Sequence, residues 1–151
     1  MSLVKFISVM AVGLLFVSAS SAWGQGCAIT ATSVNFGGYD SYSQLDATGS
    51  VNVNCDAGLI YTVRIDAGAN SGGGFTPRIA RLAGGSDTTS YNLYRDSAHT
   101  EVWGDGTNNT FVRTGAGTGT VEMLAVYGRL PAGQKIVAGV YSDALTVTVE
   151  W

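Results

Sequence analysis

The stretch DALTVTVEW runs from Asp143 to Trp151, at the end of this 151-residue chain. Polar and apolar side chains alternate along it, which is the pattern of a β-strand with one buried face. One face of the predicted strand carries the apolar row Leu145, Val147, Val149 and Trp151. A strand of this kind needs a neighbour on each edge, or its unpaired backbone becomes an aggregation hazard.

Other segments repeat this two-residue period. They are GSVNVNC (49–55), IYTVRIDAG (60–68), SYNLYRD (90–96), HTEVWGDG (99–106), TVEMLAVYGRL (120–130) and VAGVYSDALTVTVEW (137–151). Glycine, which occurs 21 times, interrupts each window that could form an amphipathic helix of three turns. Glycine-rich loops are expected at 67–74, 83–90 and 113–120. Short strands at this spacing predict an all-β fold, an antiparallel sandwich or barrel.

The first 22 residues have the pattern of a secretory signal peptide. Lys5 precedes the apolar run FISVMAVGLLFV (6–17), and the small residues SASSA (18–22) follow it. Ser20 and Ala22 suit the positions before a cleaved bond, so we expect removal of residues 1–22 and one β-sandwich domain over residues 23–151. The alternatives are a membrane anchor, for which the run falls short of about 20 apolar residues, and a lipid-modified start at Cys27.

Cys27 and Cys55 are the two cysteines of the chain. Export to an oxidising compartment favours a disulfide between them. On the chain-entropy model, closing this loop stabilises the fold by about 3.5 kcal/mol. A closed zinc site would need more ligands than two cysteines and the single His99 supply. The sequence therefore predicts a disulfide and no metal.

Composition and motifs favour a structural or binding protein over an enzyme. The net charge is −3 and the charges are scattered, which does not favour nucleic acid as a partner. No Gly-x-Ser-x-Gly elbow accompanies His99, which is expected on an exposed turn. The aspartates, among them Asp46 and Asp143, are expected mostly to cap turns at strand ends. No catalytic residues and no cofactor are predicted.

Two loops and a set of aromatic residues are candidate ligand sites. WGDGTNN (103–109) is rich in oxygen ligands but lacks the spacing of a calcium-binding EF-hand loop, which favours a plain turn. GAGTG (115–119) contains no lysine and is a weak candidate for a phosphate loop. Tyr42, Tyr94 and Trp103 are candidates for stacking on a sugar ring, although strand aromatics usually fill a core.

Six motifs, in order, resemble the spore coat protein U domain family. They are FGGYD (36–40), GSVNVNC (49–55), YNLYRD (91–96), VWGDG (102–106), VYGRLPAGQ (126–134) and GVYSDALTVTVEW (139–151). The resemblance covers essentially all of residues 23–151. It implies an immunoglobulin-like antiparallel β-sandwich that is incomplete, because its last strand is supplied by a partner.

The family includes subunits of archaic chaperone-usher pili, surface fibres that serve adhesion and biofilm formation. The resemblance therefore implies a secreted pilus subunit that passes through the periplasm to the cell surface. Its implied partners are a periplasmic chaperone, an outer-membrane usher, a neighbouring subunit that donates a strand, and a surface or glycan receptor. The strand is expected to enter a groove beside Leu145, Val147, Val149 and Trp151.

The chain departs from the family pattern at the expected mature start. Polymerising subunits carry an alternating apolar extension before the first cysteine, whereas only WGQG (23–26) precedes Cys27 after the predicted cleavage. Four residues cannot lie along a neighbour's groove as a strand. We therefore expect a subunit that accepts a strand without donating one, as at a fibre tip. The alternative is a self-sufficient secreted coat or carbohydrate-binding module.

Overall fold

The structure is a computed structural model that describes residues 2–9 and 24–151. Its strands are β1 (Ser2–Val9), β2 (Cys27–Ala31), β3 (Leu45–Cys55), β4 (Ile60–Ile65), β5 (Arg78–Leu82), β6 (Thr88–Tyr94), β7 (Arg113–Ala116), β8 (Val121–Leu130) and β9 (Tyr141–Glu150). No helix in this part of the chain is long and apolar enough to cross a membrane. All strand pairs are antiparallel.

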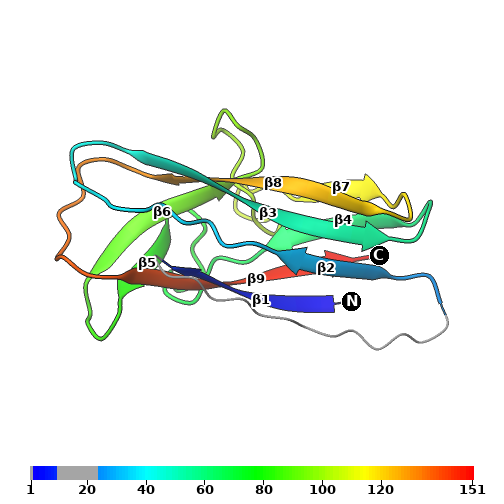
Figure 1. Cartoon of the computed structure of the whole chain (residues 1–151), viewed down its shortest axis with the longest axis horizontal. Coiled ribbons are helices and arrows are strands. Elements are labelled where there is room, and N and C mark those ends of the chain that lie inside the picture. The colour runs from blue at the N-terminus through cyan, green and yellow to red at the C-terminus, as the bar shows by residue number, and fades with distance from the viewer. Residues whose placement is uncertain (1, 10–23) are drawn as a thin grey trace.

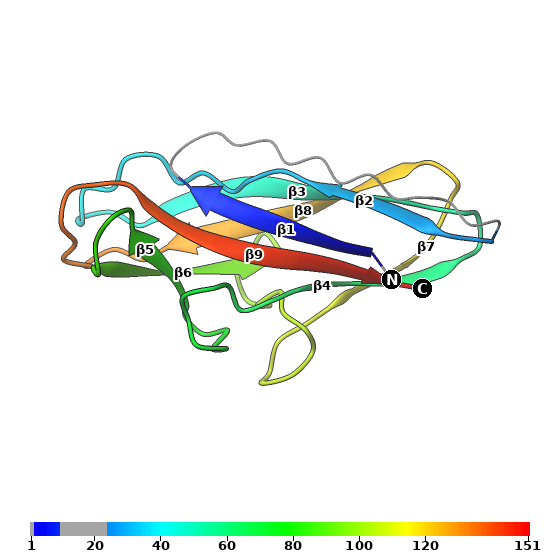
Figure 2. The ribbon, with the colours of Figure 1, turned by 90° about the horizontal axis from the view of Figure 1, so that it is seen from below.

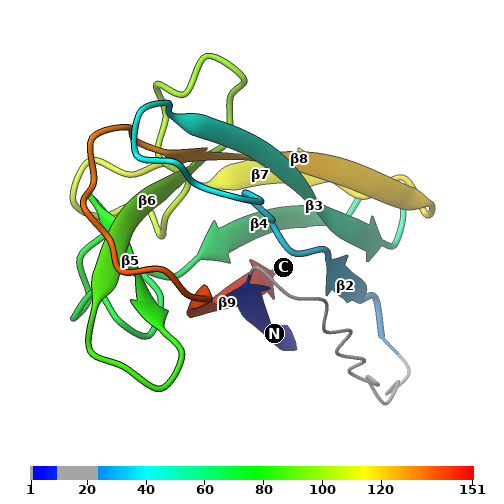
Figure 3. The same ribbon diagram turned by 60° about the vertical axis from the view of Figure 1, so that its left-hand side comes forward.

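The strands form a β-sandwich (Figure 1). One layer is β2-β3-β8-β6 and the other is β9-β4-β7, with β1 paired to the free side of β9. β6 pairs with β8 in the first layer and with β5, while β5 pairs with β9 in the second. The two layers are thus continuous through β6 and β5, which cross from one to the other in Figure 3.

Alternating side chains from both layers fill the core. Val51 and Val53 of β3 face Val63 of β4 and Val147 of β9 in one hydrophobic cluster. Each is at most 1% exposed, which explains why β-branched residues recur at every second position of these strands. Trp103 lies fully buried in the same cluster, and its indole Nε1 donates to the carbonyl oxygen of Val63 at 3.1 Å.

The all-β prediction is confirmed, and most predicted strands correspond to β3, β4, β6, β8 and β9. The expected strand at 99–106 is wrong, because this segment makes isolated bridges at Val102 and Trp103. The Asp96 carboxylate accepts hydrogen bonds from the amides of Thr100 and Glu101, which holds a turn there instead.

The expected loop at 113–120 is also partly wrong, because residues 113–116 form β7 on the edge of β4. Gly115 permits this pairing, since a Cβ there would lie 2.5 Å from the Tyr61 ring. The alternation pattern also missed β2 and β5, which have five residues each.

The predicted signal peptide, residues 1–22, which we also call the leader, overlaps the described residues in part. Residues 2–9 form β1, whereas the expected cleavage site around Ser20, Ala22 and Trp23 lies outside the described residues. Removal of residues 1–22, and the single domain over 23–151, therefore remain predictions.

Candidate functional site

One edge of β9 is hydrogen-bonded to the body of the sandwich. The start of β9 pairs with β5 and its end pairs with β4. Between these stretches, the amides of Asp66 and Ala69 donate to the carbonyl oxygens of Thr146 and Ala144, each at 3.0 Å. This edge of β9 is therefore occupied along its length by other segments of the sandwich.

Within residues 2–9 and 24–151, the other edge of β9 is paired with β1 alone. The register places Ser2 opposite Val149 and Val9 opposite Ser142. β1 also runs beside β2, the edge strand of the other layer, so that it lies between β9 and β2 in Figure 2. We call the strip that β1 fills the β9–β2 groove.

β1 lies entirely within the segment that the sequence predicts to be removed. Without residues 1–22, the backbone of residues 142–149 would lose its partners along this edge. Successive residues of an antiparallel strand direct their N–H and C=O groups to alternate edges, so about half of these groups would be unpaired. Such an edge pairs readily with a strand from another chain.

The predicted groove residues lie in β9 or just after it. Leu145, Val147 and Val149 are 2%, 1% and 0% exposed, and all three belong to the core cluster. Trp151 is 43% exposed, so it does not continue this buried row. The reason is that β9 ends at Glu150, and Trp151 lies beyond the last residue paired with β4.

A buried carboxylate that the sequence did not predict belongs to the same row. Asp143 is 2% exposed and accepts hydrogen bonds from the Tyr91 hydroxyl at 2.7 Å and the Asn70 side-chain amide at 2.9 Å. The amides of Ala69 and Ala144 donate to it at 3.0 Å each. Burial raises the pKa of Asp143, and these hydrogen bonds act against that rise. The spacing 143, 145, 147 and 149 indicates the buried position, although the aspartate is expected at a turn.

A neighbouring cavity lies beside the start of β9. It has a volume of about 390 Å³ and is mostly apolar, with Val34, Phe36, Tyr91, Leu130 and Tyr141 among its lining residues. Tyr91 thus contributes its ring to this cavity and its hydroxyl to Asp143. Tyr141, which lines the cavity, directly precedes Ser142, the partner of Val9, so the cavity adjoins this end of the β9–β2 groove.

The disulfide between Cys27 and Cys55 is confirmed. It joins the first residue of β2 to the last residue of β3, which are direct register partners. β2 has five residues and pairs with β3 alone among the described strands, so this covalent link fixes one side of the β9–β2 groove. Cys27 is used in the disulfide, which leaves no free thiol at that position.

The expectation of an exposed His99 is wrong. Its side chain is 9% exposed and lies between the rings of Tyr94 and Tyr127, with centroids 5.2 and 6.2 Å away. Its Nε2 lies 4.0 Å from Asp46, which sits within β3 and binds Arg129 rather than capping a turn.

The other candidate ligand residues do not assemble into a site. Tyr42 is 91% exposed, whereas Trp103 is buried in the core, so the two do not form one stacking surface. The Asp105 carboxylate accepts hydrogen bonds from the amide and hydroxyl of Thr107, as expected for a turn. The described residues contain no group of three or more acidic, histidine or cysteine side chains that could hold a metal ion.

The architecture defines the class of protein. It is an antiparallel β-sandwich in which one edge of the last strand, β9, is paired with β1, a segment of the predicted signal peptide. The family model for the Spore Coat Protein U domain matches residues 13–148, and the chain belongs to this family. Protein U of Myxococcus xanthus is 30% identical over 129 residues, which cover 77% of this chain and 70% of that protein.

A solved structure has the same fold. It is the crystal structure of the CsuC-CsuE chaperone-tip adhesion subunit pre-assembly complex from archaic chaperone-usher Csu pili of Acinetobacter baumannii. The TM-score is 0.64 at 22% identity, and the match covers 84% of this chain. This chain spans 40% of the length of the solved chain. The fold is therefore an immunoglobulin-like β-sandwich, as the resemblance to the family implied.

Proposed function

We propose that this protein is a subunit of a chaperone-assembled surface fibre and that its β9–β2 groove accepts a strand from a partner. One observation carries the proposal. Among the described residues, the edge of β9 that faces away from β4 and β5 is paired only with β1, a segment of the predicted leader. Once the leader is removed, an edge of eight residues requires a replacement strand. Strand addition would supply main-chain hydrogen bonds along that edge.

The resemblance to a chaperone-bound pilus subunit supports the identity of the partners. In this proposal a periplasmic chaperone first fills the groove, an outer-membrane usher admits the subunit to the fibre, and a neighbouring subunit then supplies the permanent strand. The protein would act at the cell surface in adhesion or biofilm formation. Leu145, Val147 and Val149 would form the apolar floor beneath the donated strand, with Trp151 at its margin.

The predicted cleavage also bears on the position in the fibre. With the mature start at Trp23, four residues precede Cys27, which is the first residue of β2. A segment of this length cannot pair along the eight positions that β1 covers on β9. The subunit would accordingly accept a strand and not donate one, as a subunit at the tip of a fibre would.

A second candidate is a self-sufficient coat or carbohydrate-binding module. The observation in its favour is that residues 2–9 of the same chain already cover β9. A chain that kept this segment would complete its own sandwich and would need no partner. Membership of a family named for a spore coat protein also supports this candidate.

Site-specific crosslinking from β9 would separate the two candidates. A photo-reactive amino acid is placed at Thr146, a half-buried residue that alternates with the buried Leu145 and Val147 of β9, in protein expressed with its secretion machinery. The control position is Thr62 on β4, which β9 and β7 flank on both sides. A strand-accepting subunit should crosslink to a chaperone in the periplasm and to another subunit at the surface from position 146, and much less from position 62. Crosslinks only within the chain itself would favour the self-sufficient module.

A further inference from the structure

A polar pocket opens between the turn that follows β6, the start of β7 and the strand β8, apart from the β9–β2 groove. It has a volume of about 470 Å³ and is lined by Arg95, Asp96, Ser97, Glu101, Arg113 and Tyr127. None of these residues belongs to β9 or β2. The volume lies within the range of small-ligand sites, about 300–1,000 Å³. We call it the Arg95–Arg113 pocket.

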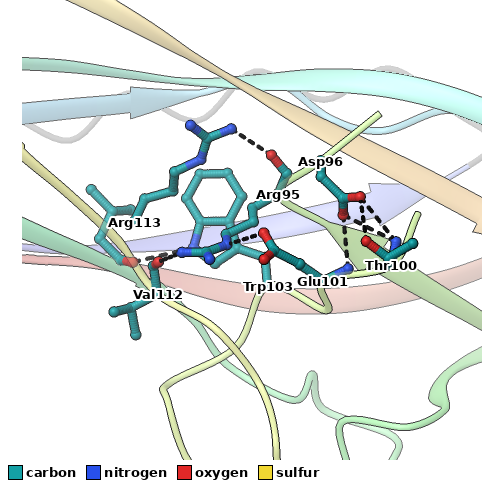
Figure 4. A network of polar contacts seen from close by, with 8 residues as sticks. Arg95, Asp96, Thr100, Glu101, Trp103, Val112 and Arg113 are labelled. Carbon is teal, nitrogen blue, oxygen red and sulfur yellow. Dashed lines mark hydrogen bonds and ion pairs between the residues drawn. The ribbon is translucent and has the colours of Figure 1, made fainter. Parts of the chain in front are cut away.

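The Arg95 side chain in this pocket is held in one position. Its guanidinium lies 4.7 Å from the centroid of the Phe111 ring. Its Nε donates to Glu101 at 2.7 Å and its Nη1 donates to the carbonyl oxygen of Val112 at 2.6 Å (Figure 4). A long side chain fixed in this way loses little further entropy when it binds a ligand.

The neighbouring groups are fixed as well. Asp96 accepts hydrogen bonds from the Thr100 amide and hydroxyl and from the Glu101 amide, which holds the turn that presents Glu101 (Figure 4). The Arg113 guanidinium lies 5.7 Å from the centroid of the buried Trp103 ring and donates to the carbonyl oxygen of Arg95. The wall of the pocket is therefore preorganised by contacts that do not involve a ligand.

Several polar atoms of the wall take part in none of these contacts, and the buried Nε of Arg113 has no hydrogen-bond partner among the described residues. Arg95 Nη2 and Glu101 Oε1 make no hydrogen bond to the described residues, and the two side chains are 28% and 38% exposed. The ion-paired side chains of Arg95 and Glu101 thus offer one further donor and one further acceptor. A sugar hydroxyl both donates and accepts hydrogen bonds, so two adjacent hydroxyls match such a pair.

The charged side chains of the pocket and the Tyr127 ring indicate which class of ligand fits. Two arginines and two carboxylates line the pocket, so a phosphate would meet the acids and a cation would meet the guanidinium groups. A neutral ligand avoids both repulsions. The Tyr127 ring offers an apolar surface of the kind that packs against the C–H groups of a sugar.

We propose that the Arg95–Arg113 pocket binds a neutral saccharide unit, with Arg95 Nη2 and Glu101 Oε1 as the hydrogen-bonding pair. Binding here does not depend on the groove, because no pocket residue lies on β9 or β2. A subunit whose groove is filled by a partner strand would still present the pocket. The pocket would accordingly serve as a receptor site in either a fibre subunit or a coat module.

The test is a binding assay on an array of neutral and acidic oligosaccharides, with the protein in the form in which it is isolated, alone or with a strand partner. The variants are Ser97→Ala and Glu101→Gln. The matched control is Glu150→Gln, which also removes the acid of an exposed Arg–Glu ion pair, Arg64–Glu150 at 3.1 Å. Thermal unfolding of each variant is measured alongside binding.

The proposal expects binding to at least one neutral saccharide. Glu101→Gln should weaken it about tenfold or more, because a neutral amide replaces the charged acceptor and the ion pair that orients Arg95 is lost. Ser97→Ala should weaken it less, and Glu150→Gln should leave it unchanged, although both Glu→Gln variants alter thermal stability to a similar small extent. Binding to acidic saccharides alone, no binding at all, or equal binding by all variants would overturn the proposal and leave the proposed function of the groove untouched.

Discussion

At the scale of single residues, Asp143 connects β9 to the body of the sandwich. Its carboxylate receives four hydrogen bonds, from β6, from the loop after β4 and from its own neighbour. A buried carboxylate is costly unless all of its acceptor positions are used. The start of β9 is therefore sensitive to each of these donors.

Tyr91→Phe should destabilise the protein by about 1–3 kcal/mol, because it leaves the buried Asp143 carboxylate without its hydroxyl donor. Tyr141→Phe is the matched control, since its hydroxyl binds the carbonyl oxygen of Val137 at 2.9 Å. The control should cost about 0.5–1.5 kcal/mol. Urea unfolding of the protein with its groove filled measures the loss of unfolding free energy in both variants. Equal losses would argue against a special role for Asp143 and its hydrogen-bond donors.

Gly68→Ala should be more harmful than Gly73→Ala. Both glycines have positive φ angles, +87° and +93°, so both substitutions strain the backbone. A Cβ at Gly68 would lie 2.0 Å from an oxygen of Asp143, whereas at Gly73 it would meet nothing within 4 Å. Gly68→Ala should therefore cost about 1–3 kcal/mol more. Thermal unfolding of the two variants provides the comparison, and similar values would show that the loop moves freely away from Asp143.

Asp46 should give the protein a measurable pH dependence. Arg129 donates to both oxygens of Asp46 at 2.7 Å, and this holds the pKa of Asp46 below its ordinary value of 3.8. Folding thus favours the ionised carboxylate, so its stabilisation is present at neutral pH and is lost as the pH falls through the lowered pKa.

Asp46→Asn should accordingly cost up to about 1 kcal/mol at neutral pH, since the pair is partly exposed to solvent. The difference from the unsubstituted protein should vanish well below pH 3.8. Urea unfolding of both proteins at neutral pH and at a pH well below 3.8 measures this difference in stability. A difference that persists in acid would mean that Asp46 acts by packing and not by its charge.

The sequence predicts the apolar residues of the site better than the polar ones. Leu145, Val147 and Val149 are expected from alternation alone, because an inward row of β-branched and aliphatic residues is typical of the buried face of a strand. The predictions for Asp143 and His99 are wrong, because a polar residue in a strand pattern gives no sign of whether it has buried partners. The partners of Asp143, such as Tyr91 and Asn70, lie far away in sequence.

At the scale of elements, long alternating strands are predictable and short ones are not. β3, β8 and β9 have ten or eleven residues each, so their period is evident. β5 and β7 have five and four residues, and their pairing depends on edges that the rest of the fold creates. The pairing of β1 with β9 also depends on tertiary structure, because the same residues have the pattern of a signal peptide.

The disulfide should be the main element-level stabiliser of the β2 side of the groove. Cys27→Ala/Cys55→Ala should lower the stability by about 3.5 kcal/mol, because it reopens a loop of 28 residues in the unfolded chain. Urea unfolding of oxidised protein measures this loss. Reduction of the unsubstituted protein serves as the control and should produce a similar loss. A double variant as stable as the oxidised protein would contradict the role assigned to this bond.

At the scale of the whole molecule, the proposed function depends on one claim: residues 23–151 lack a strand that completes their sandwich. The register suggests how to supply that strand within one chain. Ser2 lies opposite Val149 and β1 runs antiparallel to β9, so residues 2–9 can follow Trp151 through an Asn-Gly turn and two further residues that lie opposite Trp151 and Glu150. Such a permuted chain keeps the pairing of the structure while it removes the leader from the N-terminus.

The decisive measurement compares the protease resistance and cooperative unfolding of residues 23–151 alone with those of the permuted chain. A second permuted chain, in which the added strand has a scrambled and polar sequence, controls for length. We expect that the chain with residues 2–9 restored is monomeric, protease-resistant and unfolds cooperatively, while the other two are degraded or aggregate. If residues 23–151 alone prove as stable and monomeric as the permuted chain, the sandwich is complete without a partner and the claim is contradicted.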